Sequence, residues 1–282
     1  MVFSVASFNI NSVRLRAPLL RDWLAKHRPD VVGLQEIKCE TKLFPHADLA
    51  TIGDDLAYDI FVHGQKSYNG VALLIKKNKD APPPRLIREH LFSPTTCDQQ
   101  EAEPHPARYI EAEVNHMRLI NIYAPNGNPV HDDSGGHSEK FLYKISWLKE
   151  LKRYIEQELL ANDIPTLVFG DFNVCPEDID CYDATAMAGD ALLQPESRAA
   201  FRGLLSIGLI DLFRSHHPRE ELCYSYWDYQ AGAFQKNNGL RIDFILASPA
   251  LADSLTQVTI DNAPRHREKP SDHTPVVAQF AL

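Results

Sequence analysis

The sequence predicts a single α/β domain in which two packed, mixed β-sheets are flanked by helices. Three observations support this prediction. Strand-like segments recur from one end of the 282 residues to the other, helical patterns lie between them, and no linker, low-complexity tract or close tandem repeat divides the chain. Near-continuous apolar strands are typical of sheets that are covered on both faces. Because α/β domains reach this length as one unit, we expect one domain over residues 1–282.

Seven segments have the composition of buried strands. Val, Ile, Leu and Phe dominate each segment, and turn residues bound it. The segments are Phe3–Ile10, Val31–Gln35, Val71–Ile75, Leu119–Tyr123, Thr166–Gly170, Ile242–Leu246 and Val276–Phe280.

Three helical patterns lie between these strands, each with apolar residues at helical spacing. The first begins at Pro18, because proline suits the first turn of a helix. The third begins at Ser197 and ends before Gly208, which suits a C-terminal stop. The apolar stripes contain Leu19, Leu20, Trp23 and Leu24 in the first helix, Phe141, Ile145, Leu148 and Ile155 in the second, and Phe201, Leu204 and Leu205 in the third.

The composition narrows the class of protein. The chain is 44% hydrophobic and carries a net charge of −9, which argues against a sequence-independent nucleic-acid coat but not against a nuclease with a local basic rim. No apolar run approaches the roughly 20 residues of a membrane-spanning helix, and the N-terminus lacks the features of a signal peptide. The five cysteines form no Cys-x-x-Cys pair. We therefore expect a cytoplasmic protein with reduced thiols and no membrane contact.

Polar side chains at the ends of the strands are the most informative feature. Asp171 and Asn173 follow one apolar strand and share a face, because side chains alternate with period two. Asn121 and Tyr123 share a face in the same way. The remaining strand-end residues are Asn9, Glu36, Asp243, Asp272 and His273. Each has a structural explanation when taken alone, such as an Asx turn or a surface carboxylate, but together they indicate one convergent site.

The residue types of this site indicate its chemistry. The carboxylates at 36, 171 and 272 and the amides at 9 and 173 are hard oxygen ligands, which suit Mg²⁺ or Mn²⁺ better than zinc. Asp243, within an apolar strand, needs a buried partner or a metal. A His with a nearby Asp forms a general-base pair, and Tyr and Asn can donate hydrogen bonds to a phosphoryl oxygen. Because no nucleophile elbow or Walker loop is present, water is the expected attacking group, and the site predicts phosphodiester hydrolysis.

Six motifs in order carry a resemblance to a known family. They are Ser7-Phe8-Asn9-Ile10-Asn11, Gly33-Leu34-Gln35-Glu36, Asn121-Ile122-Tyr123-Ala124-Pro125-Asn126, Gly170-Asp171-Phe172-Asn173, Gly239-Leu240-Arg241-Ile242-Asp243 and Ser271-Asp272-His273. Together they resemble the exonuclease III family of the exonuclease/endonuclease/phosphatase superfamily, over essentially the whole chain. The resemblance implies a four-layered, DNase I-like α/β sandwich. It also implies a monomer that repairs double-stranded DNA with Mg²⁺ or Mn²⁺, cutting 5′ to abasic sites, removing nucleotides 3′ to 5′ and clearing blocked 3′ ends.

The resemblance assigns the metal ligands. Glu36 is then the principal ligand, and Asn9 and Asp272 complete or support its site. Asp171, Asn173 and His273 are further candidate ligands around the same ion.

The same resemblance implies the catalytic roles. Asp171 would orient or deprotonate the attacking water, or protonate the leaving oxygen, and Asn173 would position that water or stabilise the transition state. His273, held by Asp243, would bind the scissile phosphate or act as the base. Tyr123 would contact the phosphate or donate a proton. Spacing alone leaves the choice of base between Asp171 and His273 open, because coupled groups titrate together.

The DNA-binding residues are also implied by family positions. Arg108 and Asn126 match phosphate contacts, and His273 faces the scissile phosphate. Tyr226 and Leu240 match an apolar pocket for a flipped-out abasic sugar, although a bacterial member carries Trp where Tyr226 stands. We predict that the loop 126–138 is mobile and lies near DNA, with Lys140 at its exit.

Two alternative functions follow from the same residues. The superfamily includes phosphatases and phosphodiesterases of inositol phosphates and sphingomyelin, so a different phosphoester is one alternative substrate. A non-catalytic DNA-binding role is the other. That role predicts the loss of at least one catalytic residue, whereas Glu36, Asp171, Asn173, Asp243 and His273 are all present.

Overall fold

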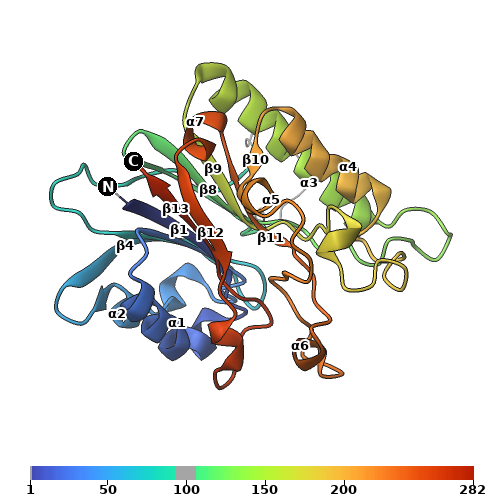
Figure 1. Ribbon diagram of the computed structural model, residues 1–282, viewed down its shortest axis with the longest axis horizontal. Helices are drawn as coiled ribbons and strands as arrows, with labels where there is room; N and C mark the ends of the chain where they lie inside the picture. The colour runs from blue at the N-terminus through green and yellow to red at the C-terminus, as the bar shows by residue number, and fades with distance from the viewer. Residues whose placement is uncertain (1, 93–105) are drawn as a thin grey trace.

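The computed structural model describes residues 2–92 and 106–282, which form four layers. Two β-sheets pack face to face, and helices cover the outer face of each sheet (Figure 1). The predicted four-layered α/β sandwich is therefore confirmed.

The first sheet contains seven strands in the order β12-β13-β1-β2-β5-β4-β3. β1 is parallel to β2 and antiparallel to β13, so segments from the two ends of the chain are neighbours in this sheet. The strands are β1 Val2–Asn9, β2 Val31–Gln35, β3 Thr51–Ile52, β4 Leu56–His63, β5 Val71–Lys76, β12 Leu255–Ile260 and β13 Val276–Ala281.

The second sheet contains six strands in the order β10-β11-β9-β8-β7-β6. β8 and β9 are parallel, and β11 is antiparallel to β9. The strands are β6 Arg85–Arg88, β7 Tyr109–Val114, β8 Met117–Tyr123, β9 Thr166–Asp171, β10 Ile210–Asp211 and β11 Asp243–Ala247.

Each layer boundary has its own apolar core. Val5, Leu73 and Phe169 are among the residues that fill the space between the sheets. On the outside, Trp23 of α1 packs in the cluster beneath the first sheet, and Trp147 of α3 packs in the cluster beneath the second. The helices are α1 Val13–His27, α2 His46–Leu49, α3 Glu139–Tyr154, α4 Pro195–Ser206, α5 Leu212–His216, α6 Ala233–Lys236 and α7 Pro249–Ala252. Shorter turns are 3₁₀ at Thr41–Leu43, Leu160–Asn162, Asp178–Asp180 and Ala263–His266, and π-helical at Ile155–Leu159.

Buried hydrogen bonds also join the two sheets. Asn121, at the centre of β8, donates from Nδ2 to the carbonyl oxygens of Leu34 and Ala72 in the first sheet, at 2.9 Å each. Its Oδ1 accepts from Gln35 Nε2 at 2.6 Å. The backbones approach closely here, since a Cβ on Gly33 would lie 2.4 Å from the ring of Phe169. These bonds fix the position of one sheet relative to the other.

All seven predicted strands are present, with ends that differ by at most two residues. The third predicted helix begins at Pro195, two residues before Ser197. Two other details were wrong. Pro18 is not in the first turn of its helix, because α1 begins at Val13 and Pro18 is its sixth residue. Proline has no N–H for the carbonyl of Arg14, and the helix tolerates this because both residues lie on its exposed side. Asp243 begins β11 rather than lying inside a strand.

The six strands that the sequence did not predict are two-residue pairs or strands interrupted by polar residues. β7, for example, carries Glu111 and Glu113. The four described cysteines are free thiols, as predicted, and Cys97 lies outside the described residues. No helix in the described part of the chain has both the length and the apolar run needed to span a bilayer.

Candidate active site

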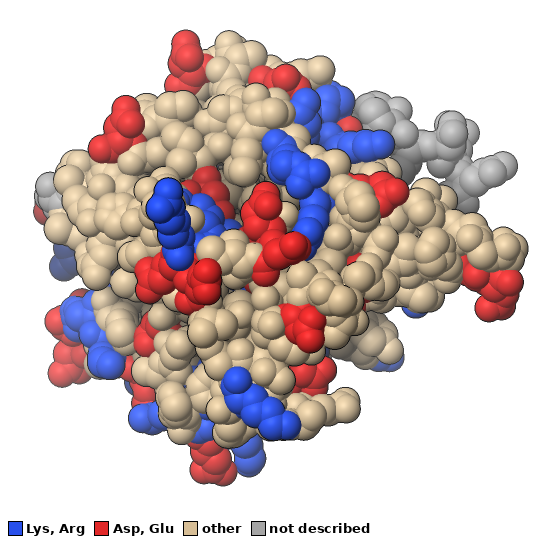
Figure 2. Space-filling view, turned by 45° about the vertical axis from the view of Figure 1, so that its right-hand side comes forward, with Lys and Arg blue, Asp and Glu red and all other residues tan. Residues whose placement is uncertain are grey.

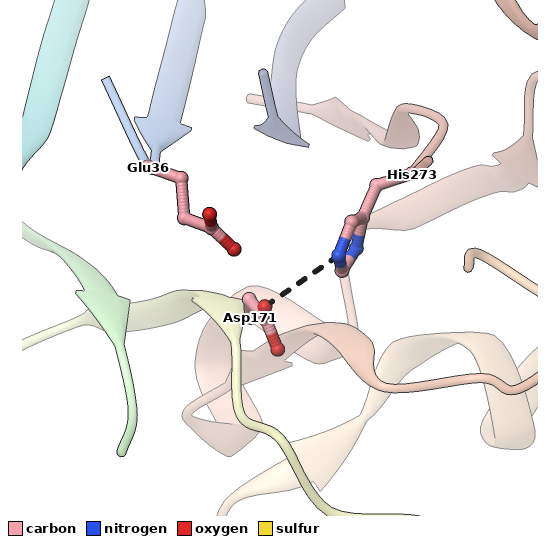
Figure 3. A group of neighbouring side chains, drawn as sticks. All are labelled: Glu36, Asp171 and His273. Carbon is pink, nitrogen blue, oxygen red and sulfur yellow. Dashed lines mark ion pairs between the residues drawn. The ribbon is translucent and has the colours of Figure 1, made fainter. Parts of the chain in front are cut away.

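The carboxyl ends of the two parallel strand pairs meet at one edge of the sandwich, and the predicted site forms there. Glu36 directly follows β2, Asp171 ends β9, and His273 precedes β13. One ligand atom of each residue lies within 4.8 Å of the others (Figure 3). Segments that are far apart in the sequence thus bring three of the predicted metal ligands together.

Asn9 connects the two sheets at this point. It ends β1 and is completely buried. Its Nδ2 donates to Glu36 Oε1 at 2.9 Å and to Asp171 Oδ2 at 3.0 Å, while its Oδ1 accepts from the backbone N–H of Asn11. In this arrangement the nitrogen faces the carboxylates, so Asn9 supports the two acidic side chains through hydrogen bonds.

Glu36 remains ionised at neutral pH. Its backbone is left-handed, with φ of 49°, and this directs the side chain from the end of β2 into the site. Burial alone would raise the pKa of Glu36, but the ammonium of Lys38 and the Asn9 amide outweigh it and hold that pKa below its usual value. Lys38 Nζ lies 2.7 Å from Glu36 Oε2. The sequence did not single out Lys38.

The environment of Asp171 raises its pKa, whereas that of Glu36 lowers the pKa of Glu36. Asp171 is 1% exposed, and Asn9 and the backbone N–H of Asn173 donate to it, the latter at 2.9 Å. Burial, together with the nearby carboxylates of Asp243 and Glu36, raises the pKa of Asp171 to about 7, although His273 opposes the change. The site therefore holds more negative charge than its own cations neutralise.

His273 is fixed by Asp243, as predicted. Its Nδ1 lies 2.8 Å from Asp243 Oδ2, and its Nε2 lies 3.8 Å from Asp171 Oδ2. Burial disfavours the imidazolium, but the surrounding carboxylates, Asp243 foremost, outweigh this and raise the pKa of His273 to about 10. Ser225 donates its hydroxyl to the same Asp243 oxygen at 2.7 Å. Sequence reasoning missed Ser225, because only its burial between aromatic residues distinguishes it.

The segments after β8 and β9 place the predicted polar donors. Asn173, with φ of 50°, donates from Nδ2 to the carbonyl of Ala124 at 2.9 Å, and its Oδ1 accepts from Asn126 Nδ2 at 3.3 Å. Tyr123 ends β8, and the guanidinium of Arg108 lies over its ring at 4.7 Å. Burial and the carboxylates of Glu36 and Asp171 raise the pKa of Tyr123, so its hydroxyl keeps its proton.

Asp272 lies at the rim, outside the group of three. Its Oδ1 accepts from Asn11 Nδ2 at 2.9 Å. Its role as a metal ligand stays a prediction.

A pocket of about 480 Å³ opens over these groups, and one of its walls is apolar. Tyr226 and Leu240 line this wall, and their backbones exchange two hydrogen bonds. The ring of Tyr226 lies 4.9 Å from that of His273. Tyr182 and Met187, which the sequence analysis did not select, also line the pocket. The space beside the catalytic groups is therefore suited to a small, weakly polar group.

The loop 126–138 extends outward from the body of the molecule beside α3 (Figure 1). Lys140 is exposed as the second residue of that helix. On the face shown in Figure 2, acidic side chains gather near the middle, and Lys and Arg side chains lie around them. The predicted mobility of the loop and the DNA contacts of Lys140 stay predictions.

The donor set fits a hard divalent cation. The carboxylate oxygens of Glu36 and Asp171 lie at the centre, and the carboxylates of the site exceed the neighbouring cations in charge. Magnesium in proteins is commonly held by one or two carboxylates together with substrate oxygens, and manganese accepts similar ligands.

The fold and the site together define an α/β-sandwich protein with an acidic cluster at its strand ends that could hold a metal ion. A model of the Endonuclease/Exonuclease/phosphatase family matches residues 6–273, so the chain belongs to that family. The exodeoxyribonuclease III of Haemophilus influenzae is 37% identical over 281 residues, covering 97% of this chain and 98% of the relative.

Solved structures agree. An AP endonuclease from Archaeoglobus fulgidus has a TM-score of 0.86 and 33% identity, covering 99% of this chain and 100% of that one. The 3′ phosphatase NExo from Neisseria, solved with a product DNA hairpin, has a TM-score of 0.84 and 34% identity with the same coverage. The resemblance to exonuclease III is thereby confirmed.

Proposed function

We propose that this protein is a Mg²⁺-dependent DNA repair nuclease of the exonuclease III type, with Mn²⁺ as a second usable ion. It hydrolyses phosphodiesters of double-stranded DNA 5′ to abasic sites and at 3′ ends, and it removes 3′-blocking groups. The observation that carries the proposal is the convergence of Glu36, Asp171 and His273 within 4.8 Å. The relatives support it, since they include an exodeoxyribonuclease III, an AP endonuclease and a 3′ phosphatase.

Glu36 would hold the cation, with Asp171 and His273 within reach and Asn9 and Asp272 supporting the site. The bound ion supplies Lewis-acid charge stabilisation to a phosphoryl oxygen. Among the protein groups, Asp171 orients the attacking water and takes its proton. His273, whose Nδ1 is held by Asp243 at 2.8 Å, presents its other nitrogen to the scissile phosphate as a hydrogen-bond donor.

Two further side chains act on the phosphate. The Tyr123 hydroxyl, which keeps its proton, donates to it, and Asn173 positions the water or stabilises the charge that develops in the transition state. Arg108, Asn126 and Lys140 contact DNA phosphates. Because such contacts release counterions, DNA binding weakens as salt concentration rises. Tyr226 and Leu240 form the wall against which a flipped-out abasic sugar packs. We propose that the protein works as a monomer in the cytoplasm.

The test uses two labelled duplexes, one with a central abasic analogue and one intact with a recessed 3′ end, each with Mg²⁺ and with EDTA. Metal-dependent incision at the analogue supports the abasic endonuclease. Stepwise shortening of the intact duplex alone shows a 3′ exonuclease whose pocket does not admit the abasic sugar. No reaction on either duplex, with a folded protein and metal present, contradicts the proposal and favours a different phosphoester. Inositol phosphates are then the next substrates to assay.

A further inference from the structure

Lys144 is a buried cation beneath the site that the catalytic proposal does not use. It lies on the inner side of α3 and has no exposed surface. Its Nζ donates to three backbone carbonyl oxygens, those of Asn126 at 2.9 Å, Asn173 at 2.5 Å and Ala191 at 3.3 Å. An ammonium has three N–H donors, so these bonds use all of them.

The three carbonyls belong to three separate segments that border the pocket. Asn126 follows β8, Asn173 follows β9, and Ala191 lies between the pocket residues Asp190 and Leu192. Further hydrogen bonds join the segment after β8 to the segment that contains Ala191. Asn128 Nδ2 donates to Asp190 Oδ1 at 3.1 Å, and the backbone N–H of Ala191 donates to Asn128 Oδ1 at 3.0 Å. Lys144 reaches all three segments from a single atom.

Space filling does not account for this lysine. Burying an ammonium is costly, and within the described ranges no carboxylate forms an ion pair with Lys144, so carbonyl oxygens are its partners. A methionine fills a similar volume without the desolvation cost. The stem is also tightly enclosed, since a Cβ on Gly127 would lie 2.6 Å from Lys144 Cδ. The ammonium is therefore held at one position.

That position bears directly on Asn173. The backbone of Asn173 is left-handed, a conformation that neighbouring structure must maintain. Its side chain pairs with the side chain of Asn126, and Lys144 holds the main-chain oxygens of both residues. A shift of either segment would move the Asn173 side chain relative to Asp171, whose Oδ1 accepts from the backbone N–H of Asn173.

We propose that Lys144 is a positioning residue: its ammonium fixes Asn126 and Asn173 relative to Asp171, so that the Asn173 amide meets the reacting phosphate group. This inference rests on the proposed nuclease function. Lys144 does not touch the substrate and acts through Asn173.

The experiment compares K144M, K144Q and the exposed control K149M from the same helix. It also measures K144M and K144Q in an N173A background, with Mg²⁺ on the abasic duplex. K144M should lower kcat by at least about tenfold with little change in KM, because small misplacements of catalytic groups are costly. K144Q retains N–H donors and should recover part of the rate, and K149M should match wild type. In the N173A background, either substitution should cause at most about a twofold further loss, as expected for coupled residues.

Equal losses in K144M and K144Q, or an undiminished loss in the N173A background, would overturn the role of Lys144, as would a K144M enzyme with normal kcat. Thermal unfolding establishes that each variant is folded. If K144M does not fold, the K144Q measurements in both backgrounds decide the question. An inactive wild-type protein contradicts the nuclease function and this inference together, whereas an active wild type with unaffected variants contradicts only the inference.

Discussion

Two clusters of buried charge lie in this protein, and they differ in the balance of positive and negative groups; Arg241 belongs to one and Asp243 to the other. The arginine cluster consists of Asp180, Asp211, Arg214 and Arg241. Arg241 lies 2.7 Å from Asp180 and 2.8 Å from Asp211, and Arg214 lies 2.5 Å from Asp180. Two carboxylates thus face two guanidinium groups, and the cluster is neutral.

The second cluster, which we propose to be catalytic and call the catalytic cluster, consists of Glu36, Asp171, Asp243 and His273. Three carboxylates share one imidazole, with Lys38 at the edge beside Glu36. Asp243 Oδ1 is buried and has no hydrogen-bond partner among residues 2–92 and 106–282. Each carboxylate of this cluster disfavours the ionisation of its neighbours. Burial and the nearby carboxylates of Asp243 and Glu36 accordingly raise the pKa of Asp171.

The difference distinguishes buried charges that stabilise the fold from buried charges that attract a ligand. A balanced cluster stabilises the fold only while all its members are present, and it has no capacity for a ligand. An unbalanced cluster destabilises the empty protein and attracts a cation. The following predictions test this distinction, from the largest expected effect to the smallest.

Asp171→Asn removes one of the surplus negative charges and the proposed base. We expect turnover to fall by about 10²–10⁴-fold and DNA affinity to stay near that of wild type, while the free energy of unfolding rises because a surplus buried negative charge is removed. Single-turnover kinetics and titration with labelled duplex measure the first two quantities, and urea unfolding measures the third. Turnover close to wild type would refute the role of Asp171.

Arg241→Met breaks the balanced cluster: Asp211 loses its guanidinium partner, while Asp180 keeps Arg214. Removing one partner of a buried ion pair is expected to lower the free energy of unfolding by about 3–5 kcal/mol. Urea unfolding measures this change, and kcat of the folded fraction should remain near wild type. A loss of kcat without a loss of stability would assign Arg241 to the catalytic cluster instead.

Added Mg²⁺ should stabilise the protein through the catalytic cluster, since a ligand that binds only the folded state contributes about 2.7 kcal/mol at a hundred times its Kd. The rise in Tm with Mg²⁺ should shrink in Glu36→Gln. Lys149→Met, which alters a distant exposed charge, is the control and should respond as wild type does. An unchanged Mg²⁺ response in the Glu36 variant would contradict the assignment of Glu36 as the ligand.

Replacement of the loop tip, residues 130–137, by a short Gly-Ser turn alters neither cluster. We expect DNA affinity to fall by several-fold, equivalent to about 1 kcal/mol, with the Tm response to Mg²⁺ preserved. Fluorescence anisotropy with the abasic duplex measures the affinity. Affinity equal to wild type would remove this loop from the DNA-binding surface.

The parts of the molecule that the sequence predicted share a physical cause. The seven predicted strands include those buried on both faces, such as β2 and β9, where every residue is buried and polar side chains stand only near the ends. Edge strands such as β12 alternate polar and apolar residues less regularly and were missed. Strand-end residues such as Asp171 were predictable because alternation along a strand fixes the face of a side chain. Ser225 and Lys144 were not, because their roles depend on contacts between segments distant in the sequence.

The side-chain hydrogen bonds that join the two sheets allow activity and stability to change independently of each other. Apolar surfaces in contact can slide by fractions of an ångström at little cost, whereas a hydrogen bond loses most of its strength when its geometry is disturbed. Asn9 and Asn121 span the boundary with such bonds, and Asn9 ends them on the catalytic carboxylates themselves. The alignment of the two halves of the active centre is therefore set by directional bonds rather than by core packing. Core substitutions that make the protein easier to melt should leave its catalytic geometry intact until the sheets separate.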